Sequence, residues 1–404
     1  MSSDPYVPVT DRSIITTLWP VLCAAIVGLV PFTVYSTYLV PIADSVSADT
    51  AAVGTLRGLG GVAALVTAIV FAPLLIRWRP TTAAATSLVL LALAAVVGTI
   101  PALAALATFC LGIGVATAML LPALLTTATS TYTDTRDGGR AATMVTSCQT
   151  LAAVMAAPVI GVLAVWTGWR GVLWVTAGLA ILIALYLVIR FRSAEGAPAS
   201  AIGYWAAFRR IRARPDLLAL IGIAALRTAS FMGYLAFLAA RYDSRFDMSA
   251  GTFTLVWTLS GASFFVGNFY AGRWLRRIDT AGRTPAMTVV ASLAAVVAAV
   301  LVVFTTDVLM VALGATVAMG VGHAVIAAQV TTLIAHRGGE VTATAYSLNA
   351  AGMSFGVFAG ATIGGVGLSV GGSLGLGIAL AVPVVVAGAL VPVAMMDGTG
   401  PQRL

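Results

Sequence analysis

The stretch Arg136-Asp137-Gly138-Gly139-Arg140 recurs 200 residues later as His336-Arg337-Gly338-Gly339-Glu340. Each copy lies between two long apolar segments, and each half of the chain holds six such segments. Two similar units in the same orientation are typical of parallel repeats around an axis normal to a membrane. The repeat therefore predicts two bundles that can rock about a central site, an architecture that points to transport.

The composition indicates a membrane location. Hydrophobic residues make up 60% of the 404 residues and charged residues only 9%, and the mean hydropathy is +1.02. In a soluble chain, about a quarter of the residues are charged. The net charge of +8 comes from 22 arginines spread along the chain, without any lysine. Because these arginines form no single patch, we expect a lipid bilayer and no nucleic acid as the partner.

Twelve segments are apolar enough to cross a hydrocarbon core of about 30 Å, which takes roughly 20 residues of helix. We therefore predict an all-α polytopic membrane protein with 12 transmembrane helices in two pseudo-symmetric six-helix bundles. The first segment is too long for a signal-peptide core, so we expect it to remain as a span. The predicted spans are 14–38, 51–76, 82–100, 102–128, 141–166, 170–191, 217–240, 251–272, 285–305, 308–334, 342–367 and 372–395.

Arginine placement sets the predicted orientation, because basic residues accumulate on the cytoplasmic side of a membrane. With the N-terminus inside, 17 arginines lie on the cytoplasmic side, and only Arg170, Arg241 and Arg245 lie outside. We therefore expect both termini in the cytoplasm. The missing lysine indicates a GC-rich bacterial genome, so we expect the protein in the plasma (inner) membrane. We also expect a multi-pass monomer.

One cytoplasmic connection is long enough to join two separate halves. It divides the chain into an N-terminal bundle, 1–192, a linker, 193–215, and a C-terminal bundle, 216–404. Within the linker, the aromatic and arginine residues from Tyr204 to Arg214 have spacings that suit an amphipathic helix at a membrane surface.

The sequence offers no enzyme chemistry. It has no Walker loop for ATP, and its two histidines and three scattered cysteines give no metal-ligand cluster. We therefore expect neither a cofactor nor a metal. The expected partners are a small-molecule substrate and, as a further candidate, protons.

Several local motifs resemble those of the major facilitator superfamily. The family's cytoplasmic loop of glycine, acid and spaced arginines is similar to Gly267-Asn-Phe-Tyr-Ala-Gly272-Arg273-Trp-Leu-Arg276-Arg277, in which Gly272 replaces the acid. The matching loop of the first half keeps only its basic residues, Arg77 and Arg79. The resemblance implies twelve spans, and it implies that these loops help to latch one conformational state through charge pairing.

The fifth and eleventh spans resemble those of the exporter, or antiporter, branch. Pro158 and Gly161 belong to a stretch similar to the exporters' glycine-proline motif, and Gly168-Trp169-Arg170 matches an element on their outer side. The eleventh span is rich in glycine up to Gly372, which also suits close helix packing without any substrate. The resemblance implies a twelve-span exporter of drugs or sugars.

Ionisable side chains at membrane depth are costly and are therefore candidate functional groups. No acidic residue lies in the middle of a span, whereas many proton-coupled exporters place a carboxylate there. Arg57 lines a cavity, reaches the outer surface, or pairs with Asp44 or Asp49. Arg227 lines the cavity or bonds to helix carbonyls. His323 carries coupling protons or is a neutral, hydrogen-bonded histidine.

Polar and aromatic side chains within the spans complete the predicted substrate site, although aromatic residues at helical spacing also serve packing. With Arg57 and Arg227, the candidates are Phe32, Tyr35, Gln149, Phe231, Tyr234, Trp257, Asn268, Gln329 and Asn349.

Three functions compete. A largely apolar cavity suits an exporter of amphiphilic small molecules, such as a drug, a natural product or a sugar-like metabolite. Positive side chains at depth suit a carrier of small or organic anions, such as cyanate or nitrate. The full repeat and the lack of a soluble domain disfavour a receptor or scaffold. We favour the exporter, working by alternating access, with proton coupling implied by resemblance alone.

Overall fold

The computed structural model describes residues 9–71, 78–132, 134–191, 204–280 and 285–396. Within these ranges the chain forms helices joined by short turns, and it contains no strand. Ten helical segments are long and apolar enough to cross a membrane. Two of the ten bend sharply and make two passes each, so the described chain has the 12 passes that the sequence predicts.

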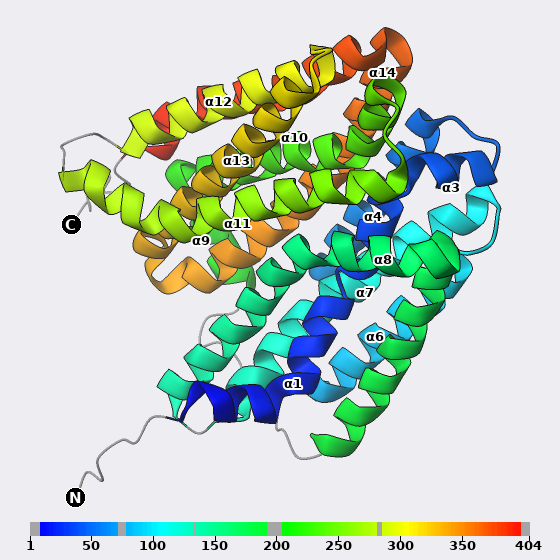
Figure 1. The fold of residues 1–404 in the computed structure, drawn as a ribbon. Helices are drawn as coiled ribbons and strands as arrows, with labels where there is room; N and C mark the ends of the chain where they lie inside the picture. Colours follow the sequence, from blue (N-terminus) through cyan, green and yellow to red (C-terminus); the bar gives the residue numbers. More distant parts are fainter. Residues whose placement is uncertain (1–8, 72–77, 133, 192–203, 281–284, 397–404) are drawn as a thin grey trace, which may run out of the picture.

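The two halves of the chain form two bundles of helices that lie side by side (Figure 1). The first bundle consists of α1 (Asp11–Val27), α2 (Val30–Thr37), α3 (Leu39–Ser45), α4 (Thr50–Val66), the π-helix η1 (Thr67–Phe71), α6 (Pro80–Val97), α7 (Leu103–Ser130) and α8 (Thr135–Arg190). The second half consists of α9 (Tyr204–Arg212), α10 (Pro215–Phe246), α11 (Ala250–Thr280), α12 (Pro285–Thr305), α13 (Leu309–Gly338), the 3₁₀ turn η2 (Gly339–Val341) and α14 (Thr342–Ala394).

Glycines produce the two bends. Gly168 in α8 has φ 63° and Gly372 in α14 has φ 57°. Side chains with a Cβ rarely adopt such angles, so glycine permits the turn. The bend at Gly168 falls between two predicted spans, and the bend at Gly371 and Gly372 falls where the twelfth predicted span begins. The first pass is also interrupted, at Gly28 and Leu29 between α1 and α2, where the sequence predicted one continuous helix.

Both described chain ends lie at one end of the molecule, which we call the terminal face (Figure 1). The opposite end, with the bends of α8 and α14, is the far face. On the terminal face, the repeated loop fastens each chain end to its bundle. Arg140 donates to the Val9 carbonyl at 2.6 Å and pairs with Asp11, and Arg337 donates to the Ala394 carbonyl at 2.6 Å. The recurrence at the sequence level thus has a structural counterpart.

The linker contains the predicted helix, α9. Ile211 is fully buried, while Arg209 and Arg212 are exposed, which is the two-sided character of an amphipathic helix. An ion pair of 2.8 Å joins Arg210 to Glu340 in the loop before α14. The helix is therefore attached to the second bundle.

The glycine-rich eleventh pass packs closely against its neighbours. A Cβ on Gly360 would overlap the Ala229 carbonyl of α10, and a Cβ on Gly365 would overlap the Thr55 hydroxyl of α4. Small residues let helices approach where lipid supplies no hydrophobic drive. These glycines therefore act in packing, as their composition alone suggested.

The bundles touch each other in the part of the molecule nearer the far face. Gly61 of α4 lies against α14, where a Cβ would be 2.5 Å from the Ser354 carbonyl. Gly261 of α11 lies against α8, where a Cβ would be 2.7 Å from the Ala153 carbonyl. Both α4 and α11 begin at the far face, so these two contacts lie about 16 Å inward at 1.5 Å per residue, near the middle of the helices. The contact of Gly365 in α14 with Thr55, the sixth residue of α4, lies closer to the far face. Towards the terminal face the two groups of helices diverge (Figure 1).

Candidate functional site

Arg227 and His323 form a buried polar pair in the middle of the second bundle. Arg227 extends from α10, and its Nη1 lies 2.7 Å from Nε2 of His323 on α13. Only 4% of each residue is exposed. A guanidinium has no acceptor, so the imidazole nitrogen that faces it must accept the hydrogen bond. The histidine of this contact is therefore neutral.

Aromatic rings and a thioether enclose this pair. The Phe231 ring stacks on the imidazole of His323 with centroids 3.9 Å apart, and the Phe264 ring of α11 lies 5.7 Å away. The Met353 sulfur of α14 lies 4.0 Å from Nη2 of Arg227. Four helices thus contribute to one mid-membrane cluster, which we call the Arg227 cluster: Arg227, Phe231, Phe264, His323, Met353 and Asn349.

Asn349 joins the cluster through its amide nitrogen, which lies 3.6 Å from the Met353 sulfur. Several buried polar atoms of this region have no hydrogen-bond partner in the described part of the chain. They include Arg227 Nε, Asn349 Oδ1 and both amide atoms of Gln329. Buried polar groups are normally satisfied, so unpaired ones call for a water molecule or a ligand.

Arg57 approaches this region from the first bundle. Its Nη1 lies 3.4 Å from the Met232 carbonyl of α10, and its guanidinium lies 5.8 Å from the centroid of the Phe32 ring. Because Arg57 is only 7% exposed, it does not reach the surface. Of its two suggested acidic partners, Asp49 instead caps α4 by accepting from Ala51 N, and Asp44 is exposed. Those two alternatives for Arg57 are therefore wrong.

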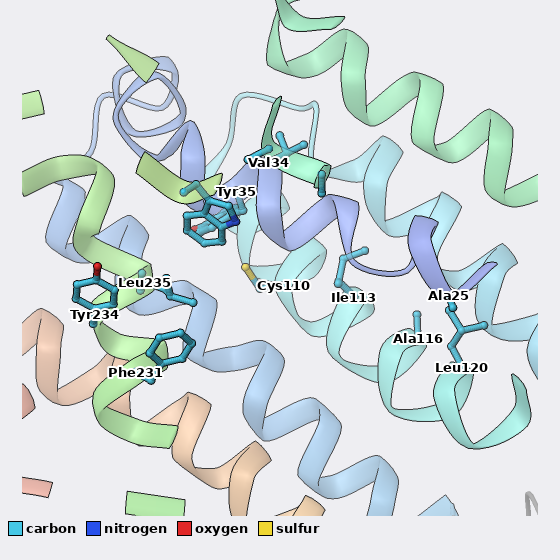
Figure 2. Packing of buried hydrophobic residues seen from close by; sticks show 14 of the residues in the cluster. Ala25, Val34, Tyr35, Cys110, Ile113, Ala116, Leu120, Phe231, Tyr234 and Leu235 are labelled. Atoms are coloured by element: carbon cyan, nitrogen blue, oxygen red, sulfur yellow. The ribbon is translucent and has the colours of Figure 1, made fainter. Parts of the chain in front are cut away.

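Aromatic residues of the first bundle pack next to the Phe32 ring that Arg57 faces. Tyr35 of α2 donates to the Val53 carbonyl at 2.6 Å and stacks on Phe109 with centroids 5.6 Å apart. Figure 2 shows Tyr35 and Cys110 in the first bundle, with Phe231 and Tyr234 on the neighbouring α10. The Tyr234 hydroxyl bonds to Thr316 Oγ1 at 3.0 Å, so this predicted site residue is engaged within its own bundle.

Other predicted site residues make no hydrogen bond or ring contact with the Arg227 cluster in the described part of the chain. Trp257 packs edge-on against Phe253, while Gln149 and Asn268 are half-buried on α8 and α11. No hydrogen bond within the described ranges joins these three to Arg227 or His323. Gln329 is buried on α13, six residues beyond His323, which is about 9 Å along a helix.

The residues of the exporter-like motifs make packing contacts. Gly161, one turn beyond Pro158 in α8, faces α11, where a Cβ would lie 2.9 Å from Thr254 Oγ1. Arg170 donates to the Thr99 carbonyl at 3.1 Å and covers the Trp169 ring. The first motif brings the two bundles together, and the second fastens the sixth pass to the end of α6.

The two arginine-containing loop motifs are described only in part. Gly267 packs against α13, where a Cβ would lie 2.8 Å from Ala324 Cβ. Arg79 is exposed beside the start of α6. Gly272, Arg273, Arg276 and Arg277 lie in the last part of α11, where the structure describes the backbone but not the side chains, and Arg77 lies outside the described residues.

Sequence reasoning missed three residues of the site. Phe264 and Met353 contact His323 and Arg227, and Met232 supplies the carbonyl for Arg57. Apolar residues are common on every side of these helices, so nothing in the pattern distinguishes the three. Among the described residues, no group of three or more His, Cys, Asp or Glu could hold a metal ion.

A separate apolar groove of about 570 Å³ lies between α6 and the second pass of α8. Its lining includes Leu93, Trp174 and Leu182, which are more than half exposed. This groove faces outward from the first bundle and contains none of the predicted site residues.

Comparison with known proteins agrees with this geometry. The fold is similar to the structure of a bacterial homologue of the human lysosomal transporter Spinster, inward-facing and unoccupied, with a TM-score of 0.78 and 17% identity over 96% of this chain and 98% of that one. The same homologue in an inward-facing, occupied state gives 0.72 and 17% over 97% of each chain. The nucleoside transporter NupG gives 0.72 and 13% over 93% of this chain and 100% of that one.

No curated protein matches the chain by sequence. The family profile described as Major Facilitator Superfamily matches residues 21–361, which is most of the chain. Twelve passes, two repeated bundles and this match support one assignment. The chain belongs to the Major Facilitator Superfamily and is a membrane transporter, not an enzyme.

Proposed function

We propose that this transporter carries a small amphiphilic molecule that bears an anionic group, by alternating access of a site between its bundles. The bundles, 1–192 and 216–404, would rock about the region where Arg57 meets α10. The observation that carries this proposal is the pair of buried guanidiniums, Arg57 and Arg227, which lack a carboxylate partner among the described residues. An uncompensated buried cation is costly and is stabilised by an anion.

The positions of the inter-bundle contacts support the conformational part of the proposal. The contacts of Gly365 with Thr55 and of Gly161 with Thr254 lie near the far face, and those of Gly61 and Gly261 lie near the middle of the helices. With both termini in the cytoplasm of a bacterial cell, as the arginine distribution predicts, this state is closed to the outside and faces inward. A carrier must also adopt the opposite state, in which these contacts separate.

The apolar walls support an amphiphilic cargo. Phe231, Phe264 and Met353 surround the charged atoms of the Arg227 cluster, which suits an aromatic or aliphatic body attached to a small charged head. Small inorganic anions are a second candidate, favoured by the same two arginines. The resemblance of the fifth and eleventh spans to those of exporters supports export as the direction, driven by the outward concentration gradient of the substrate itself.

Transport by purified protein in proteoliposomes tests the proposal. We expect exchange of labelled benzoate, an aromatic anion, in preference to a neutral glucoside or a cationic dye, with nitrate reporting on the second candidate. Arg227→Gln should abolish benzoate exchange while thermal stability stays near that of the wild type. Preference for the neutral or cationic compound would contradict the anionic head group. Measuring exchange in protein of known orientation would decide the direction.

A further inference from the structure

Because Arg227 contacts His323, the charge of His323 depends on what Arg227 is bonded to. Nη1 of Arg227 donates to Nε2 of His323 at 2.7 Å. A protonated imidazole could not accept this bond, and it would place two cations in contact within a site that is almost fully buried. While Arg227 points at His323, the imidazole is therefore held in its neutral form.

No other charged group contacts His323 within the described part of the chain. From α10, the imidazole meets Arg227 and Phe231, and from α11 it meets Phe264. On the α12 side, the neighbouring Gly322 packs against Val296, and α14 presents Met353 to Arg227. Apart from Arg227, none of these residues is titratable. The protonation of His323 thus depends on whether the charge of Arg227 is compensated.

We propose that the Arg227–His323 pair binds a monovalent organic anion and a proton together. This inference rests on the proposed function only in placing the anionic head of the substrate at this pair. The two ligands bind cooperatively because the anion neutralises Arg227 and takes its hydrogen bond, which frees Nε2 of His323 to accept a proton. Linkage makes the effect reciprocal, so the proton also favours the anion.

The exchange balances in bonds and charge. The bond from Arg227 Nη1–H to His323 Nε2 breaks, and a bond from the same N–H to a carboxylate oxygen forms. A proton from the buffer acid adds to the free electron pair of Nε2, which leaves the buffer base in solution, and the new N–H can donate to the second carboxylate oxygen. The pair carries one positive charge when empty, and it carries one again when the anion and proton are both bound.

Isothermal titration of the full-length protein with benzoate, at one pH in two buffers of different ionisation enthalpy, measures the protons taken up on binding. For the wild type we expect uptake of about one proton per benzoate, and binding that tightens by up to about tenfold per pH unit as the pH falls. His323→Gln keeps an acceptor for Arg227, so it should bind benzoate without proton uptake. His336→Gln, which changes the other histidine at the exposed end of α13, should behave like the wild type.

Each outcome decides a different point. Benzoate binding by the wild type with neither proton uptake nor pH dependence overturns the cooperative pair and leaves the proposed transport of anions standing. Full proton uptake by His323→Gln overturns the role of His323. If the wild type does not bind benzoate, the anionic head group and the cooperative pair both fail, whereas alternating access is unaffected. The pH dependence of wild-type binding requires no variant to fold.

Discussion

Gly61 and Gly261, which are 200 residues apart, make equivalent contacts in the two bundles. Each is the twelfth residue of a helix that begins at the far face, and each lies against a helix of the opposite bundle: Gly61 at Ser354 and Gly261 at Ala153. The contacted residues, Ser354 and Ala153, are 201 residues apart, so the repeat relates them to within one position. The interface between the bundles therefore contains two glycine contacts that the repeat relates to each other.

Enlarging these glycines should prevent the far face from closing. In Gly61→Leu, the new side chain would meet the Ser354 carbonyl and the Phe358 nitrogen, which are backbone atoms and cannot rotate away. We expect at least tenfold slower transport with the fold intact. Spin labels at the exposed positions Ala52 and Ser369 should report a longer distance than in the wild type. Gly388→Leu is the matched control, because a Cβ there meets nothing within 4 Å; equal label distances in both variants would contradict the steric argument.

Arg241 should matter for stability far more than its neighbour Arg245. Arg241 of α10 is buried against the end of α12, where it donates to the carbonyls of Val303 at 3.1 Å and Thr306 at 2.5 Å. Removing a charged donor from buried carbonyls costs about 1.5–3 kcal/mol. Arg245 forms an exposed pair with Asp307, which is worth under about 1 kcal/mol. In thermal unfolding, Arg241→Gln should therefore lower Tm by several degrees more than Arg245→Gln does. Similar shifts would show that Arg241 is not a structural anchor.

Arg57 should add to the affinity for an anion bound at Arg227. The carbonyl that it contacts, Met232, lies five residues from Arg227, a rise of about 7.5 Å along α10. At an effective dielectric constant of about 20, two opposite unit charges within about 12 Å of each other attract by about 1.4 kcal/mol or more, which is a factor of about ten in affinity. We expect Arg57→Gln to weaken benzoate binding roughly tenfold or more. Arg57→Lys, which keeps the charge, should retain much of the affinity, and equal losses in both variants would indicate that the guanidinium geometry matters instead.

The sequence predicted the passes well because their signal is local. Apolar length specifies each crossing, and residues such as Gly168 and Gly372 interrupt helices in a way that is visible without tertiary information. The break after Val27 was missed because the residues around it remain apolar. Span boundaries thus depend on composition, which the sequence displays directly.

The site was predicted only in part because helix rotation is not a local property. Arg227 and His323 were singled out by their cost at membrane depth, and the structure brings them together. That same reasoning could not place them on facing sides of α10 and α13, since both helices are apolar on nearly every side. Phe264 and Met353 illustrate the limit: their types are common in spans, and only tertiary packing gives them a role.

Transport of the anion should carry no net charge if the proton accompanies it. A carboxylate and a proton together are neutral, and the pair has the same charge loaded and empty, so the membrane potential does no net work over a transport cycle. In proteoliposomes, an imposed pH gradient should drive benzoate accumulation in the wild type, and a potassium diffusion potential of either sign should leave the rate unchanged. His323→Gln should lose the response to pH and gain a response to voltage, because its cargo is the anion alone. If voltage drives the wild type as strongly as it drives this variant, then the proton does not travel with the anion.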